Sequence, residues 1–340
     1  MLAGCATGRP TLEQRIDALM RDYDADVPGA SLLVLHDGVP RVRRGYGLAD
    51  LEAGTPATPR SNYRLASVSK QFTAAAVLLL AQDGRLRLDD PVRRWLPTLP
   101  AAADAVTLHH LLTHTSGLLD YEDLMDPADT RQVRDVDVLR LLETQDRTYF
   151  APGSDYRYSN SGYALLALVV ERASGQRYAD FLAARIFRPL GMTRTVAYEA
   201  GRSEVADRAF GYSVENGAWR RTDQSTTSAV LGDGGLYSSI DDLAKWDAAL
   251  YDDRLLTHAS RELAFAPATA TDDPEVRYGY GWRITAGMLW HSGESIGFRN
   301  VILRWPQQRL TVVLLTNRDD PEPYALATRI AALAMDDAAP

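Results

Sequence analysis

The stretch RLASVSKQFTAAAVLLLAQDG, residues 64–84, places two serines and a lysine at the start of a long apolar segment. Residues three apart on a helix share a face, so Ser67 can touch Lys70, whereas Ser69, directly beside the lysine, cannot. A serine hydroxyl is a weak nucleophile that needs a base, and a lysine that has lost its proton can serve as one. The stretch predicts a helix over 67–82 with Ser67 as nucleophile and Lys70 as base; a helix cap beside a surface lysine is the alternative.

Strand patterns lie at both ends of the chain. ASLLVLHDGVPRVRRGYG predicts a hairpin around Asp37-Gly38, and Thr11 with Gln14 predicts a capping box ahead of it. YGYGWRITAGMLWHSG, FRNVILRW and LTVVLLTN read as three strands, and PYALATRIAALAM reads as a closing helix. Between the two ends, the clearest helical patterns after the first are 136–145, 160–173, 177–187 and 241–251.

These patterns predict an α/β fold of the α+β type. An antiparallel sheet would form from the N- and C-terminal strands and be flanked by helices, with a mostly helical region inserted. We expect a tail over 1–10, a sheet region over 11–65 plus 252–340, and a helical region over 66–251. The two regions would form one catalytic unit with its site between them.

The composition narrows the classes of function. The chain has 340 residues, of which 46% are hydrophobic, and 37 Lys and Arg against 45 Asp and Glu give a formal net charge of −8. This acidic balance without a basic run argues against a nucleic-acid partner. The apolar run 74–81 is too short to span a bilayer.

The single cysteine, Cys5, excludes an internal disulfide and an all-cysteine metal site. Its setting, Leu2-Ala3-Gly4-Cys5, resembles the lipobox of bacterial lipoproteins, in which the cysteine is lipidated after cleavage. Only Met1 precedes it, so the charged and apolar parts of a signal peptide are absent from this chain. We expect a periplasmic or cell-envelope lipoprotein anchored to the membrane through Cys5; a chance tetrapeptide is the alternative.

Two further stretches carry groups suited to acyl transfer. YRYSNSGYALL places Tyr158 and Asn160 ahead of an apolar helix, where a phenol can relay a proton and an amide can hold a lysine and a substrate carbonyl. LWHSGESIGFRN places His291, Ser292 and Gly293 at the end of a strand, where glycine permits close approach of a substrate backbone. A capped turn and a packed strand end are the alternatives for the two stretches.

Two histidines have a spacing that could form a metal site. His110 and His114 stand four apart on an expected helix, a spacing that permits a shared metal ion. No glutamate stands beside His110, so we assign both rings to packing or hydrogen bonding, and we expect no metal and no cofactor.

S-x-x-K, Y-x-N and H-x-G, in this order, resemble the three-part active site of the penicillin-recognising serine hydrolases. The chain is similar to the branch that contains class C β-lactamases, D-alanyl-D-alanine peptidases, D-aminopeptidases and related esterases. LHHLLTHTSGL and GDGGLYSSIDDLAKW also read like that family, and the likeness covers most of residues 12–335. It implies a β-lactamase/transpeptidase-like fold.

The resemblance also implies roles for single residues. Ser67 would be the acylated nucleophile, Lys70 and Tyr158 would share proton transfer, and Asn160 would orient Lys70 and the substrate amide. The backbone N–H groups of Ser67 and Glu294 would form the oxyanion hole.

Two positions depart from the class C pattern. His291 stands where those β-lactamases usually carry lysine, and a histidine is half-charged near pH 6.5, so we expect activity to titrate near neutral pH and β-lactam hydrolysis to be poor. Glu294 stands where members that bind a substrate carboxylate often carry a small hydroxyl. Unless it turns away or pairs with Arg299, its charge favours esters, or peptides recognised at their amino end.

The sequence thus predicts a serine hydrolase of amide or ester bonds, of peptidase or esterase type, acting through a Ser67 acyl-enzyme on a small-molecule or peptide substrate. A class C-like β-lactamase and a non-hydrolytic penicillin-binding or scaffold protein are the alternatives. The natural substrate and the oligomeric state are left open.

Overall fold

An eight-stranded antiparallel sheet takes strands from both ends of the chain in the computed structural model, which describes residues 10–338. The strand order is β10-β11-β12-β13-β14-β15-β1-β2, so β15 near the C-terminus pairs with β1 near the N-terminus. The strands of this sheet are β1 (Ala30–His36), β2 (Val39–Tyr46), β10 (Thr269–Ala270), β11 (Arg277–Tyr278), β12 (Arg283–Thr285), β13 (Met288–Ser295), β14 (Phe298–Trp305) and β15 (Leu310–Thr316).

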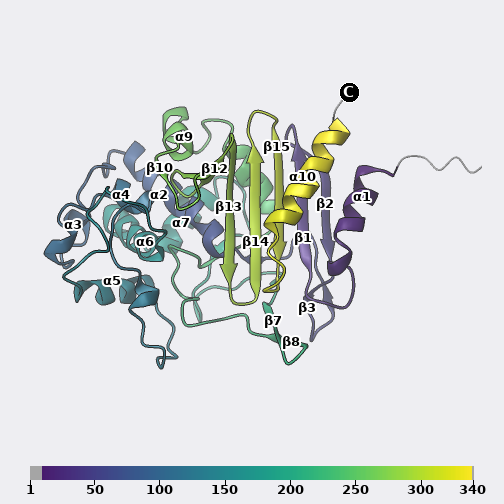
Figure 1. The fold of residues 1–340 in the computed structure, drawn as a ribbon, viewed down its shortest axis with the longest axis horizontal. Coiled ribbons are helices and arrows are strands. Elements are labelled where there is room, and N and C mark those ends of the chain that lie inside the picture. Colours follow the sequence, from purple (N-terminus) through teal and green to yellow (C-terminus); the bar gives the residue numbers. More distant parts are fainter. Residues whose placement is uncertain (1–9, 339–340) are drawn as a thin grey trace, which may run out of the picture.

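Helices lie on both faces of the sheet and form a separate lobe beside it (Figure 1). The helices α1 and α10 pack together on one face, whereas α8 packs on β1 and β15 from the other, and the lobe is built around α2 and α6. The helices are α1 (Leu12–Leu19), α2 (Lys70–Gln82), α3 (Val92–Trp95), α4 (Leu108–Leu112), α5 (Asp135–Glu143), α6 (Asn160–Ser174), α7 (Tyr178–Leu182), α8 (Ile240–Ala249), α9 (His258–Phe265) and α10 (Tyr324–Ala338).

Short strands outside the large sheet connect these layers. Two of them, β5 and β6, flank β9 in a small sheet, and β5 leads directly into the turn that contains Ser67. The short strands are β3 (Leu48–Asp50), β4 (Thr55–Pro56), β5 (Tyr63–Arg64), β6 (Val196–Ala197), β7 (Tyr212–Glu215), β8 (Ala218–Arg221) and β9 (Leu236–Ser238).

The apolar run in β1 explains the position of the sheet between two helical layers. Successive side chains of a strand face opposite sides, so Leu32 and Val34 join the core under α1 and α10, while Leu33 and Leu35 join the core of the helical lobe. Burial on both faces is the reason why this strand reads as a continuous apolar run rather than an alternating one.

Several local predictions are confirmed. Thr11 and Gln14 form the capping box of α1, and Asp37 and Gly38 both have positive φ in the turn between β1 and β2. Within residues 10–338 no helix combines the length and the apolar character that crossing a bilayer requires. Cys5 lies outside the described residues, so the lipoprotein hypothesis stays a prediction.

Two element predictions are wrong in detail. The stretch 278–293 is not one strand, because the chain turns at Gly281 and Gly287, both with positive φ, and forms parts of β11, β12 and β13. The predicted helix over 67–82 begins as a 3₁₀ turn, Ala66–Ser69, and becomes α-helical at Lys70.

Candidate active site

The first two predicted site residues meet at the start of α2. The nitrogen Nζ of Lys70 lies 3.0 Å from Oγ of Ser67, and the lysine side chain is fully buried. In a 3₁₀ turn, residues i and i+3 eclipse each other, so the turn aligns this pair more closely than an α-helix would. Ser69 instead accepts a hydrogen bond from the backbone N–H of Leu236. The structure therefore brings Ser67, and not Ser69, to the lysine.

Two more acceptors surround the Lys70 nitrogen. It donates to Oδ1 of Asn160 at 2.8 Å and to the backbone carbonyl oxygen of Asp233 at 3.0 Å. The Asn160 amide is oriented for this contact because its Nδ2 donates to Glu122 at 2.9 Å. Carbonyl oxygens can only accept, whereas the Ser67 hydroxyl can accept or donate. A neutral Lys70 would thus keep two N–H groups on Asn160 and Asp233 and direct its lone pair at the Ser67 hydroxyl.

Tyr158 flanks this pair. The Lys70 nitrogen lies 5.0 Å from the centre of the Tyr158 ring, and the Arg283 guanidinium lies 5.4 Å from the same centre. The Tyr158 hydroxyl is shielded from solvent and has no hydrogen-bond partner among residues 10–338. A shielded hydroxyl without a partner costs free energy and calls for a functional reason, such as a partner supplied by substrate.

The third predicted motif reaches the same place from β13. Gly293 lies against the backbone of Leu65, just before the nucleophile turn. A small cavity of about 50 Å³ opens there, and its wall includes Ser67, Asn160 and Glu294. The structure therefore brings three distant segments of sequence together around one cavity. Its full lining is Arg64, Ala66, Ser67, Tyr121, Glu122, Asn160, Thr227, Asp233, Gly234, Glu294 and Ser295.

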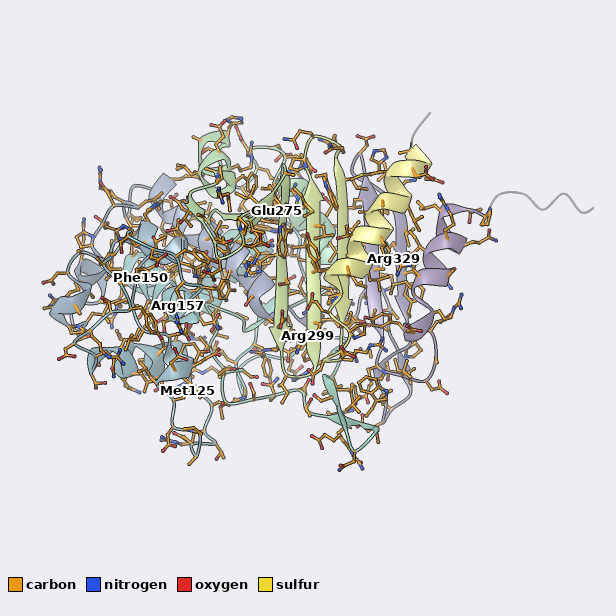
Figure 2. The ribbon with its side chains drawn as sticks, in the orientation of Figure 1. Met125, Phe150, Arg157, Glu275, Arg299 and Arg329 are labelled. Atoms are coloured by element: carbon orange, nitrogen blue, oxygen red, sulfur yellow. The ribbon has the colours of Figure 1, made fainter. Side chains whose placement is uncertain are left out.

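The Glu294 side chain turns toward the neighbouring strand. It stands opposite Arg299 of β14, with 3.9 Å between Oε2 of Glu294 and Nε of Arg299, and it is 59% exposed. Figure 2 shows Arg299 near the end of the sheet's central strands where β14 begins. Pairing and exposure both weaken the repulsion that Glu294 would exert on a substrate anion. Ser292 is not among the residues that line the cavity. Its carbonyl oxygen accepts a hydrogen bond from Nδ1 of His291.

His291 is buried behind the cavity rather than exposed in it. Its Nδ1 lies 2.6 Å from the carbonyl oxygen of Ser292, and its Nε2 lies 2.9 Å from the Tyr278 hydroxyl. Since a carbonyl can only accept, Nδ1 carries the proton and Nε2 accepts from the phenol. Burial, followed by the charge of Arg283, lowers the pKa of His291 well below its usual value. The prediction of a half-charged ring near neutral pH is therefore wrong, because the ring is neutral there.

Sequence reasoning missed two acidic groups of the cavity. Asp233 lies in the GDGG loop, is buried, and accepts a hydrogen bond from the Tyr121 hydroxyl at 3.0 Å. Burial, helped by the nearby Asp135, raises the pKa of Asp233 to about 8. Glu122 lies at the mouth, where desolvation and then the charge of Asp120 raise its pKa. The GDGG stretch could have pointed to Asp233, but no sequence motif contains Glu122.

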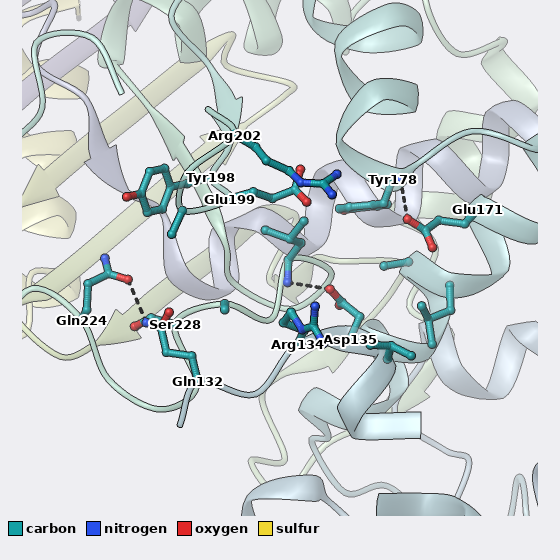
Figure 3. Close-up of a pocket in the computed structure, with 16 residues that line it drawn as sticks. Gln132, Arg134, Asp135, Glu171, Tyr178, Tyr198, Glu199, Arg202, Gln224 and Ser228 are labelled. Carbon is teal, nitrogen blue, oxygen red and sulfur yellow. Dashed lines mark hydrogen bonds between the residues drawn. The ribbon is translucent and has the colours of Figure 1, made fainter. Parts of the chain in front are cut away.

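A second, larger cavity of about 390 Å³ is lined in part by Ser228, Ala229 and Leu231, which precede Asp233 in the chain (Figure 3). None of the predicted site residues lines it. At its floor the buried Asp135 carboxylate accepts the backbone N–H groups of Leu231 and Gly232 at 3.0 and 2.9 Å. This contact supports the loop from behind and so helps to place the Asp233 carbonyl beside Lys70.

The assignment of His110 and His114 to hydrogen bonding is confirmed, but the helix expected to carry both is shorter than predicted. Helix α4 ends at Leu112, and His114 follows it with a positive φ of 60°, so His110 and His114 do not share a helix face. Each ring takes a backbone N–H instead, His110 from Thr107 and His114 from Ser159.

Known proteins resemble this chain over nearly all of its length. It is 33% identical over 316 residues to penicillin-binding protein 4* of Bacillus subtilis (strain 168), covering 87% of this chain and 70% of that protein. It is 30% identical over 338 residues to a D-aminopeptidase of Gluconobacter oxydans (strain 621H), covering 94% of this chain but 61% of that protein. The chain thus spans less than two thirds of the D-aminopeptidase.

Solved structures agree with the sequence comparison. The D-amino acid amidase from Ochrobactrum anthropi SV3, solved with L-phenylalanine amide, superimposes with a TM-score of 0.81 at 25% identity, covering 96% of this chain and 98% of the amidase. A family model described as Beta-lactamase matches residues 12–336. The predicted resemblance is thereby confirmed, and the chain belongs to the beta-lactamase family.

Proposed function

We propose that this protein hydrolyses small amides or esters through an acyl-enzyme on Ser67. The observation that carries the proposal is the arrangement of three acceptors around Lys70, two of which can only accept while the third is the Ser67 hydroxyl. Lys70 takes the hydroxyl proton and Ser67 attacks the carbonyl carbon; the bond to the leaving nitrogen or oxygen then breaks as Tyr158 gives that atom its proton and regains one from Lys70. Water then releases the acyl group by the reverse route.

The acyl group carries a protonated amine. The wall of the cavity of about 50 Å³ beside Ser67 includes the exposed side chain of Glu122. Glu122 at the mouth offers a carboxylate to an ammonium group and repels a carboxylate. Arg64 also lines the cavity; its Nη2 donates to the Ser228 carbonyl oxygen at 2.5 Å, whereas its Nε and Nη1 have no hydrogen-bond partner among residues 10–338.

The names of two relatives support the same substrate class. A D-aminopeptidase and a D-amino acid amidase both act, by their names, on amino acid derivatives of the D series. We extend this to the present chain as the proposal that α-amino acid amides and esters of the D series are its substrates. The neutral, buried His291 supports the same choice, since it supplies no cation for a β-lactam carboxylate.

The test compares D-alanine amide, N-acetyl-D-alanine amide, p-nitrophenyl acetate and a chromogenic cephalosporin, with turnover and intact mass as readouts. We expect turnover of D-alanine amide that vanishes in Ser67→Ala and persists in Ser69→Ala, the matched control. Turnover that survives in Ser67→Ala would overturn the mechanism. Rapid cephalosporin turnover would indicate a β-lactamase, and a mass adduct without turnover would indicate a penicillin-binding protein.

Glu122→Gln tests the amine contact separately. If the carboxylate binds the ammonium, the preference for D-alanine amide over its N-acetyl form shrinks by roughly tenfold, which corresponds to about 1.4 kcal/mol. An unchanged preference in Glu122→Gln would show that the amine is recognised elsewhere or not at all.

A further inference from the structure

His114 contacts the Tyr158 segment at three points. It lies just after α4, is 2% exposed and has a φ of 60°, a left-handed conformation that few residues other than glycine adopt. Such a conformation persists only where surrounding contacts stabilise it. Three of these contacts involve the turn that carries Tyr158.

Both chain neighbours of Tyr158 donate hydrogen bonds to His114. The backbone N–H of Arg157 donates to the His114 carbonyl oxygen at 3.1 Å, and the backbone N–H of Ser159 donates to Nδ1 of the ring at 3.1 Å. One residue therefore holds the main chain on each side of Tyr158. A glycine or alanine with the same backbone would keep the first bond and lose the second.

The His114 ring also contacts the tyrosine side chain itself. The two ring centres lie 4.3 Å apart with an angle of 37° between the planes. Tyr278 and Tyr163 lie against the same imidazole at 4.6 and 5.1 Å, which prevents the ring from turning away. Since Nδ1 accepts from Ser159, the neutral ring carries its proton on Nε2.

We propose that His114 is the positioning residue of Tyr158: it holds the backbone on both sides and packs on the ring. This keeps the tyrosine beside Lys70 with a buried hydroxyl that has no partner among residues 10–338. The inference rests on the proposed acyl transfer. Holding a reacting group in place accelerates a reaction because the ordering entropy is lost during folding rather than during each turnover.

The test is a double-mutant cycle with Tyr158. The readouts are kcat and KM for D-alanine amide, whose leaving nitrogen must be protonated before it departs. We expect His114→Ala to lower kcat by about tenfold or more, within the usual contribution of a proton-transfer group, with little change in KM. In a Tyr158→Phe background the same change should cause no further loss, because His114 acts through the tyrosine.

His114→Asn is a second variant that keeps the test valid if His114→Ala does not fold. Asparagine tolerates positive φ and keeps an acceptor for the Ser159 N–H, so it should recover part of the rate lost in His114→Ala. His109→Ala is the matched control, since His109 bonds to the Tyr280 hydroxyl at 2.8 Å and lies outside the Tyr158 contacts.

Three outcomes are informative. Equal losses from His114→Asn in the unchanged protein and in the Tyr158→Phe variant would overturn the proposal and leave His114 a structural residue. Full activity in folded His114→Ala would overturn it as well. If Tyr158→Phe itself leaves kcat for D-alanine amide unchanged, the proposed role of Tyr158 fails, which is a failure of the proposed function and is distinguishable from the other two.

Discussion

Gly293 of β13 lies so close to Leu65 that a Cβ at position 293 would overlap the Leu65 carbonyl oxygen. This contact seats the end of the strand against the turn that carries Ser67. It explains in physical terms why the H-x-G motif has a glycine, since any side chain would push the strand away from the nucleophile.

Gly293→Ala should therefore lower the reactivity of Ser67 in a protein that still folds. We expect the rate of Ser67 labelling by a fluorophosphonate to fall by ~100-fold or more, the effect of displacing an oxyanion donor. Gly54→Ala is the control, because Gly54 has a positive φ but open space around it, so it should cost about 1–2 kcal/mol of stability and leave labelling intact. Normal labelling in Gly293→Ala would contradict this role for the glycine.

The lowered pKa of His291 predicts that the protein loses stability in acid. Its folded pKa lies below the unfolded value of about 6.5, so the unfolded chain binds a proton that the folded chain does not. The stabilisation is complete above pH 6.5 and is lost as the pH falls toward the folded pKa, by at most about 1.4 kcal/mol per pH unit. Urea unfolding at pH 7.5, 6 and 5 should show a shallower decline for His291→Gln than for the unchanged protein. Parallel curves would show that His291 does not titrate in this way.

The raised pKa of Asp233 predicts the opposite trend, a loss of stability as the pH rises. Its folded pKa of about 8 exceeds the unfolded value, so the folded chain binds the extra proton and stability falls as the pH rises from about 4 to about 8. Asp233→Asn removes this titration and keeps an acceptor for Tyr121. Its stability relative to the unchanged protein should increase over that range and become constant above it. Asp26→Asn, at an exposed position, is the control, and an equal pH dependence in both variants would refute the assignment.

A buried ion pair fastens α8 to the sheet. Nε of Arg304 in β14 lies 2.5 Å from Oδ1 of Asp247 in α8, and the two side chains are 1% and 4% exposed. Asp247→Ala leaves the arginine buried without its partner, so we expect a loss of about 3–5 kcal/mol in the free energy of unfolding by urea. The half-exposed pair of Asp83 and Arg185 is the comparison, and Asp83→Ala should cost much less. Similar losses for both would argue against strong burial of the first pair.

Local chemistry made much of the fold readable from the sequence. The capping box at Thr11, the turn at Asp37-Gly38 and the apolar run of β1 depend on neighbouring residues and on period, and each was predicted correctly. The division of 278–293 into three strands was not, because glycines that turn the chain and glycines that permit close approach look alike in a sequence.

The sequence by itself determined which groups we propose to carry the chemistry. Ser67 and Lys70 are three residues apart, and local backbone geometry alone places them within reach of each other. Tyr158, Asn160 and Gly293 were recognisable by residue type and motif order. These inferences need no knowledge of long-range packing.

Only the tertiary structure decided the electrostatic state of the site. Burial beside Arg283 makes His291 neutral, the fold brings the Asp233 carbonyl to Lys70, and Glu122 reaches Asn160 across 38 positions of sequence. The physical reason is that pKa values and hydrogen-bond partners depend on distance and desolvation in three dimensions, which residue spacing along the chain does not specify.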